Sequence, residues 1–374
     1  MKAKGWMIDS LVIASFFIFL FIKFYPAWSN PIDSMNDAVH YIEAAKSGFG
    51  DNYFDFPSKN IIEYTKRIFE RFRFEAGSGI WWEDISNNVP NALRHFHSPY
   101  FIYIPSLLYM FTDKSSFWQT RITPFVFLLL TSALIYFSVN HIFYKNKKRI
   151  YGFAAAAVFL YFFASATELS PHIMFGFFNL FALISFSYYW KSRDRKILTL
   201  SFIFLSLSMA ALDSGVFAFI LIFAFLAYEE IIVNKDVRKF FYTYTKDFFI
   251  IFIITLYISW PGGVLKLNFF KNFFVNTFFA VTNHTCSFFR LITDNFLLFG
   301  LSFFVVLFFM LIILNYRKEE LILPMLVYIL GVFIFFIFVS NRKLLYVYPL
   351  FFSVIYLMGA MPYYLKKIQI VDKE

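Results

Sequence analysis

The sequence predicts an all-α polytopic membrane protein, and three observations carry this prediction. Hydrophobic residues make up 60% of the 374-residue chain, more than a single soluble core of this size would bury. Apolar runs of about 20 residues recur along the chain, which is the length that crosses about 30 Å of hydrocarbon. Polar and apolar residues do not alternate within these runs as they do in a membrane barrel, so helices that satisfy their own backbone are expected.

About 10 apolar runs are expected to span the membrane. The first follows "MKAKGWM" and lacks a small-residue cleavage site, so we expect a retained span instead of a signal peptide. Residues 98–111 are apolar over only about 13 residues, and we expect an interfacial or re-entrant helix there. The hairpin around Asp213 is short for two full crossings. The expected spans are 6–25, 117–143, 150–168, 171–190, 197–212, 214–229, 244–260, 291–314, 321–339 and 344–363.

The Lys and Arg residues, which give a formal net charge of +10, cluster in short loops that follow apolar runs. The clusters lie at 145–149, 191–196, 234–239, 316–320 and 365–367. The positive-inside rule requires this distribution of cytoplasmic loops, so both termini are expected on the cytoplasmic side of the cell membrane. The charge therefore indicates topology and contact with membrane lipids, and no nucleic-acid partner is expected.

Two outer segments, 26–116 and 261–290, interrupt the single transmembrane domain expected over residues 1–374. The first is about 90 residues long, far beyond an ordinary connection and typical of functional segments. Residues 59–74 place Ile and Phe on one stripe and charges elsewhere, as in a helix that lies in the headgroup plane. Residues 266–279 predict a second such helix. These helices are either anchors that set the depth of the protein or parts of a site.

Five short motifs follow one another along the chain. They are Asp37 with Tyr41, His97 with Pro99, Arg121 to Pro124, residues 260–267 and residues 341–351. In this order they resemble motifs of the GT-C glycosyltransferase superfamily, which includes the protein O-mannosyltransferases and the lipid A aminoarabinose transferases. The resemblance covers nearly the whole chain and implies a GT-C-type fold with its site on the outer face.

The resemblance implies a polyprenyl-phosphate sugar as donor, a lipid, glycan or protein hydroxyl as acceptor, and no cofactor. Asp37 is the expected catalytic base, which takes the acceptor proton as the oxygen attacks the anomeric carbon. An N-cap of the following helix is the alternative role for this residue. The leaving lipid phosphate needs cations, for which we expect Arg342 first and then Lys343 and Arg290. Snorkelling to the interface is the alternative for all three cations.

Further candidates lie in the outer segments or at the outer ends of spans. They are His97, which is expected at the donor phosphate, and Arg94, His95, Tyr41, Glu168 and His172. Many GT-C relatives carry an Asp at the position of His172, which leaves the donor sugar open. A divalent metal held by Asp37, His95 and His97 is not expected, because histidines at i and i+2 do not share a helical face.

Three other classes remain as alternatives. An O-antigen polymerase or ligase-like enzyme also uses lipid-linked sugars, but by family resemblance its large outer loop lies in the later half of the chain. A lipid or sugar transporter would show polar groups near mid-membrane and a repeat that relates its halves, and the sequence shows neither. A purely structural membrane protein is disfavoured by the length of segment 26–116.

Overall fold

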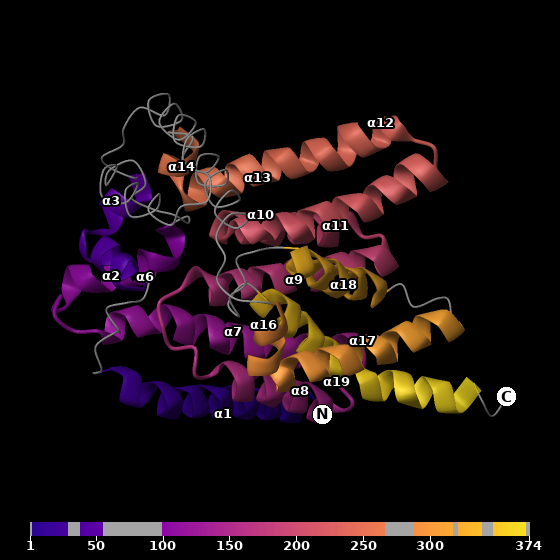
Figure 1. Cartoon of the computed structure of the whole chain (residues 1–374), viewed down its shortest axis with the longest axis horizontal. Coiled ribbons are helices and arrows are strands. Elements are labelled where there is room, and N and C mark those ends of the chain that lie inside the picture. Colours follow the sequence, from indigo (N-terminus) through magenta and orange to yellow (C-terminus); the bar gives the residue numbers. More distant parts are fainter. Residues whose placement is uncertain are drawn as a thin grey trace.

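The structure is a computed structural model that describes residues 2–28, 38–54, 99–265, 288–316, 321–338 and 347–371. Every regular element in these ranges is a helix. The long helices lie side by side in one bundle, and several short helices gather at one end of it (Figure 1). The predicted all-α class is therefore confirmed for the described residues.

Seven helical segments among the described residues are long and apolar enough to cross a membrane. Their number and length support a multi-pass membrane protein, as predicted. The helices are α1 (Lys2–Trp28), α7 (Trp118–Ile142), α9 (Pro171–Ser192), α11 (Val216–Ala227) with the π-helix η3 (Tyr228–Val233), α12 (Val237–Lys239) with the π-helix η4 (Phe240–Thr245) and α13 (Lys246–Ser259), α17 (Phe296–Tyr316), and α19 (Tyr348–Val371).

Three shorter helices coincide with the remaining predicted spans. They are α8 (Arg149–Phe163), α10 (Arg195–Ala211) and α18 (Leu323–Phe338). Their 15, 17 and 16 residues rise about 22 to 26 Å, which is less than the hydrocarbon thickness of about 30 Å. The count of ten spans therefore stays a prediction.

Helix α9 forms the centre of the bundle, where it contacts α7, α10, α18 and α19. In its apolar window 83% of the residues are buried, against 17% in α1 at the edge. Glycines let the central helices approach closely. A Cβ at Gly176 would lie 2.4 Å from a ring carbon of Phe352 in α19, and a Cβ at Gly152 would lie 2.6 Å from the carbonyl oxygen of Tyr136. Such close backbone approach is how helices pack in lipid, where no hydrophobic force drives them together.

The two ends of the bundle differ in composition. Helices α7 and α9 both begin beside α6, so their C-terminal ends lie at the same, far end. Connections 143–148, 193–194 and 234–236 lie there and carry Lys and Arg. We call this the basic end; the turn before α12 lies on the right of Figure 1. Here Arg149 pairs with Asp9 at 2.7 Å, which fixes the start of α1 to α8.

The other end, which we call the short-helix end, carries helices too short to span. They are α2 (Ala38–Lys46), α3 (Phe49–Phe54), the 3-10 turn η1 (Pro99–Ile102), α6 (Tyr103–Phe111) and α14 (Pro261–Leu265). Helix α6 has nine residues and rises about 14 Å, so it does not cross the membrane on its own. This agrees with the prediction of a non-spanning helix at 98–111.

Tyrosines attach these short helices to the bundle. The Tyr53 hydroxyl donates to the carbonyl of Ile258 at 3.0 Å, and the Tyr103 hydroxyl donates to the carbonyl of Ser259 at 2.8 Å. Both acceptors belong to the last turn of α13, whose carbonyls have no partner within the helix. Helices α3 and α6, which carry these tyrosines, are thus fixed to the end of α13.

Between α10 and α11 the chain turns through η2 (Asp213–Gly215). A Cβ at Gly215 would lie 2.6 Å from the backbone nitrogen of Met209, so only glycine fits this turn without a shift of the chain. The tight turn explains how a hairpin this short is built. Because the turn is tight, the length of the first arm of this hairpin is set by the 17 residues of α10.

Candidate functional site

A buried arginine marks the short-helix end of the bundle. Arg121 lies in the first turn of α7, and only 4% of its surface is exposed. Its Nη1 donates to the carbonyl of Thr167 at 2.9 Å and lies 3.4 Å from the Thr167 hydroxyl. Its buried Nε has no hydrogen-bond acceptor among the described residues. The oxygens of Thr167 thus occupy Nη1 and leave the Nε donor for a further acceptor.

Side-chain hydrogen bonds fix the turn from which α7 starts. The backbone nitrogen and the hydroxyl of Ser115 both donate to the carboxylate of Asp113, and they hold the pKa of that carboxyl below its usual value. The fully buried Gln119 donates to the Thr112 hydroxyl at 2.8 Å and to the carbonyl of Asp113 at 3.0 Å. These bonds set the direction of the first turn, and therefore the place of Arg121.

Glu168 is the predicted site residue that the structure brings to this arginine. It is exposed in the connection between α8 and α9, next to Thr167. It interacts electrostatically with both Arg121 and Tyr348. Tyr348 is the first residue of α19, is 7% exposed, and packs edge-on against Phe163 with ring centroids 5.0 Å apart. We call Arg121, Thr167, Glu168 and Tyr348 the Arg121 cluster.

His172, another predicted site residue, is buried in the first turn of α9. The local sequence sets where this helix begins. Ser170 is the N-cap and its hydroxyl accepts from the backbone nitrogen of His172 at 3.4 Å, while Pro171 occupies the first helical position. His172 therefore lies inside the first turn of α9, whereas Glu168 lies before the helix in the connection from α8.

Tyr41 is held at the same end by apolar packing. Its ring lies edge-on to Phe101 with centroids 4.8 Å apart. Phe101 belongs to a buried cluster that joins α2, η1 and α6 to Leu169 and Met174 at the start of α9. Leu169 directly follows Glu168, so α2 is packed close to the chain that carries the Arg121 cluster.

Neighbouring polar groups of α2 and α6 support this packing. Burial, together with the charge of Glu43, raises the pKa of Tyr109 to about 12, so its hydroxyl remains a donor. It donates to the carbonyl of Ser116 at 3.1 Å. Glu43 itself is exposed and pairs with Lys46 at 3.5 Å, three residues later on the same helix face.

Among the predicted phosphate-binding cations, Arg290 lies within the described residues. It belongs to the short helix α16 (Phe288–Asp294), and 75% of its side chain is exposed. Its Nε lies 3.5 Å from the carboxylate of Asp294, one turn later. Arg290 is thus a solvated, paired cation, unlike Arg121.

Several predicted site residues lie outside the described residues, and their roles stay predictions. They are Asp37, Arg94, His95, His97, Arg342 and Lys343. The chain is next described at Ala38 in α2, at Pro99 in η1 and at Val347 before α19. All three positions belong to the short-helix end, which also carries the Arg121 cluster.

In the described part of the chain, no group of three or more His, Cys, Asp or Glu side chains comes together to hold a metal ion. Asp37, His95 and His97, the set weighed from the sequence, lies outside that part. Comparisons of the chain with protein families, with curated proteins and with solved structures found no match. The GT-C resemblance therefore depends on the motifs alone.

Arg121 is the site residue that the sequence reasoning missed. It entered that reasoning only as part of the motif Arg121 to Pro124 and was given no role. A signal was present, because a charged residue one turn inside an apolar span is costly and usually marks a functional site. Its burial beside a carbonyl required the structure, since Thr167 lies 46 residues away in the sequence.

Proposed function

We propose that this chain is a membrane glycosyltransferase that moves a sugar from a polyprenyl-phosphate donor to an acceptor hydroxyl at the outer face of the membrane. The observation that carries the proposal is Arg121, a buried cation beside Glu168 that donates to oxygens of Thr167 and whose Nε has no acceptor among the described residues. A lipid phosphate is the kind of anion such a guanidinium binds, with two parallel hydrogen bonds. The order of the sequence motifs supports the same conclusion.

In the proposed reaction Asp37 accepts the proton of the acceptor hydroxyl while its oxygen forms a bond to the anomeric carbon of the donor sugar. The bond between that carbon and the phosphate oxygen breaks, and the polyprenyl phosphate leaves with the electron pair. A positioned base of this kind contributes about 10²- to 10⁴-fold. Asp37 directly precedes α2, which the buried cluster packs against the start of α9.

Negative charge grows on the phosphate as the bond breaks, so cations at the leaving group accelerate the step. We assign this role to Arg121 and, with it, to the predicted Arg342, Lys343 and His97. Arg342 and Lys343 precede α19 by a few residues, and α19 begins at Tyr348 in the Arg121 cluster. Arg94, His95, Glu168, His172 and Tyr41 are the candidates for contacts to the sugar and the acceptor.

The proposal also sets the orientation of the protein. By the positive-inside rule the basic end faces the cytoplasm and the short-helix end faces outward. A cysteine at Lys147 should then be shielded from an impermeant thiol reagent in intact cells, whereas a cysteine at Lys114 should react. Both residues are exposed in the structure, so a difference in their reaction with the reagent would report the side of the membrane on which each lies. Reaction at Lys147 alone would reverse the orientation and place the site inside.

The direct test is to incubate the purified protein with a panel of polyprenyl-phosphate sugars and acceptors and to measure release of the lipid phosphate. Asp37→Asn should lower turnover by about 10²- to 10⁴-fold with donor binding intact, because it removes the proton affinity but keeps the capping ability. Glu43→Gln, in the supporting pair with Lys46, should change turnover little. No release from any donor would refute the proposal.

A second candidate is a lipid or sugar transporter, which one observation favours. Asn179 of α9, Tyr328 of α18 and Ser208 of α10 form a buried polar group inside the bundle, with Asn179 Nδ2 2.9 Å from the Tyr328 hydroxyl. These groups bond to one another, which fits a structural role as well. The same panel separates the two functions, because a transporter would move the lipid without release of phosphate.

A further inference from the structure

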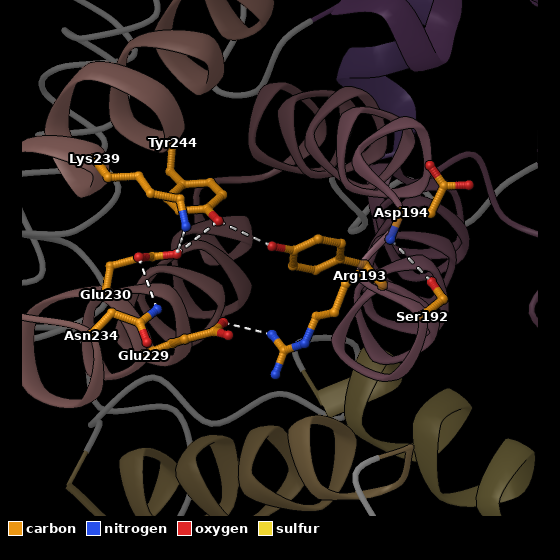
Figure 2. A network of polar contacts seen from close by, with 9 residues as sticks. Ser192, Arg193, Asp194, Glu229, Glu230, Asn234, Lys239 and Tyr244 are labelled. Atoms are coloured by element: carbon orange, nitrogen blue, oxygen red, sulfur yellow. Dashed lines mark hydrogen bonds and ion pairs between the residues drawn. The ribbon is translucent and has the colours of Figure 1, made fainter. Parts of the chain in front are cut away.

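A polar network at the basic end joins the end of α9 to the hairpin between α11 and α13 (Figure 2). At its centre is Glu230, which lies in the π-helix η3 and is 1% exposed. Lys239 donates to one of its carboxylate oxygens at 2.6 Å and Tyr244 donates to the same oxygen at 3.0 Å, while Asn234 donates to the other at 3.1 Å. The hairpin between α11 and α13 is thereby held as one rigid unit.

Two further ion pairs join this hairpin to the connection between α9 and α10. Arg193 lies 2.6 Å from the carboxylate of Glu229, as Figure 2 shows, and its guanidinium stacks over the ring of Trp190 at 4.3 Å. Arg195 lies 3.2 Å from the carboxylate of Asp247 at the start of α13. The two connections therefore form one continuous surface.

The remaining acids of this surface are also occupied. Asp194 accepts from the backbone nitrogen of Lys196 at 2.9 Å and so caps α10. Asp236 accepts from the backbone nitrogen of Lys239 at 2.8 Å and so caps α12. Every described acid of the two connections thus has a partner within the protein.

The cations of the same surface outnumber these acids. Five of them are exposed and form no ion pair with a described residue; they are Lys191, Lys196, Lys235, Arg238 and Lys246. The rigid network holds them on the two connections that the ion pairs join. Because cations outnumber acids here, the surface carries a net positive charge, which attracts anions from outside the protein.

Apolar side chains surround these cations on the hairpin. Ile232 and Val233 are 63% and 59% exposed, and Phe241 and Tyr242 are 54% and 69% exposed. The guanidinium of Arg238 lies over the Tyr242 ring at 5.6 Å. Exposed aliphatic and aromatic side chains next to cations are typical of the level at which lipid chains meet headgroups.

We propose that the hairpin 228–246, with the start of α10, is a binding site for the phosphate headgroup of an anionic phospholipid in the leaflet at the basic end. Lys235 and Arg238 at the turn, with Lys196 and Lys246 beside it, contact the headgroup, and the exposed apolar residues contact its acyl chains. A zwitterionic phospholipid carries no net charge to balance these cations, so the site prefers an acidic lipid. The inference is independent of the proposed sugar transfer.

The test uses the full-length protein in nanodiscs made of phosphatidylcholine, with or without phosphatidylglycerol, and measures the lipid retained by native mass spectrometry and the apparent Kd. The double variant Lys235→Asn with Arg238→Gln removes two cations and leaves the ion pairs in place. Asparagine is chosen because Lys235 has a φ of 55°, a backbone conformation that asparagine tolerates. The double variant should weaken phosphatidylglycerol binding by about 25-fold, or about fivefold for each cation, and less at high salt.

The matched control is Lys147→Gln with Lys148→Gln, which removes the same charge from the other exposed basic connection. The control variant should keep most of the preference of the protein for phosphatidylglycerol. Arg238→Lys alone should keep this preference too, because it retains the charge. An equal loss in both double variants would overturn the proposal, because any positive charge at this end would then suffice. So would an unchanged preference in the first double variant, or binding of soluble glycerol phosphate as tight as that of the lipid.

Discussion

The replacement of Arg121 by glutamine tests the candidate site most directly. In the protein alone this side chain makes one hydrogen bond to a carbonyl, at 2.9 Å to Thr167, and a weaker one to the hydroxyl of the same residue. A charge-assisted bond to the donor phosphate is worth about 1.5–3 kcal/mol. Its loss should weaken the binding of a polyprenyl-phosphate sugar by about 10- to 100-fold.

Arg121→Lys should give an intermediate loss, because lysine keeps the charge without the planar fork. The measurement is a titration of the purified protein in nanodiscs with the lipid-linked sugar, at low and at high salt. Thermal unfolding of each variant shows whether the fold is kept.

The matched control for this measurement is Lys114→Gln. Lys114 is a cation at the same end of the bundle, and its Nζ also donates to a carbonyl, that of Lys46 at 3.0 Å. It differs from Arg121 in being exposed, so its removal should change donor affinity by less than about fivefold. A folded Arg121→Gln protein with unchanged donor affinity would refute the phosphate role and leave Arg121 as a structural link to Thr167.

Three further predictions concern stability and are measured by unfolding in mixed micelles. Lys239→Met should lower the free energy of unfolding by about 3 kcal/mol, because it leaves the buried Glu230 carboxylate without a counter-charge. Adding Glu230→Gln to this variant should recover part of the loss, and a Lys239→Met effect that is the same with Glu230 and with Gln at 230 would contradict the reasoning. Gly176→Ala should lower the free energy of unfolding by about 1–3 kcal/mol through the clash with α19. Gly331→Ala in α18, where a Cβ meets nothing within 4 Å, should be neutral or stabilising, and equal effects of the two changes would show that the contact of Gly176 with α19 is not close. Tyr103→Phe should cost about 1 kcal/mol through the lost bond to the last turn of α13, and no change in unfolding would show that water replaces this bond.

The sequence predicted the parts of the fold that depend on composition and length. Apolar runs located the long helices, because a segment of about 20 apolar residues has few stable arrangements outside a membrane. The short helix α6 followed from the same reasoning, since its apolar stretch is too brief to cross. The helix count was harder, because α8 and α18 are apolar but stop several residues short of the usual length.

What the sequence could not predict depends on contacts between distant residues. The pair formed by Arg121 and the Thr167 carbonyl needs α7 and the end of α8 to lie side by side. The network around Glu230 needs two π-helical turns, and periodicity analysis assumes the ordinary helical repeat. Lys235 and Lys239 were read as one basic run that marks topology, although only Lys239 is neutralised within the protein.

The two ends of the bundle differ in how their charged side chains are paired. At the basic end Glu230, Glu229 and Asp247 each have a cation within 3.2 Å, so these acids are used to hold the helices together. At the short-helix end Arg121 is more deeply buried than any of those cations, and its Nη1 donates to neutral oxygens of Thr167, with the exposed Glu168 as its electrostatic neighbour. Burying a guanidinium is costly, and an apolar residue at this position would avoid that cost, so the depth of Arg121 is unusual for a residue that only holds helices together. In the proposed reaction the donor phosphate would meet Arg121 at the Nε that has no acceptor among the described residues, because the chain of the lipid donor lies in the membrane and carries its phosphate to this depth.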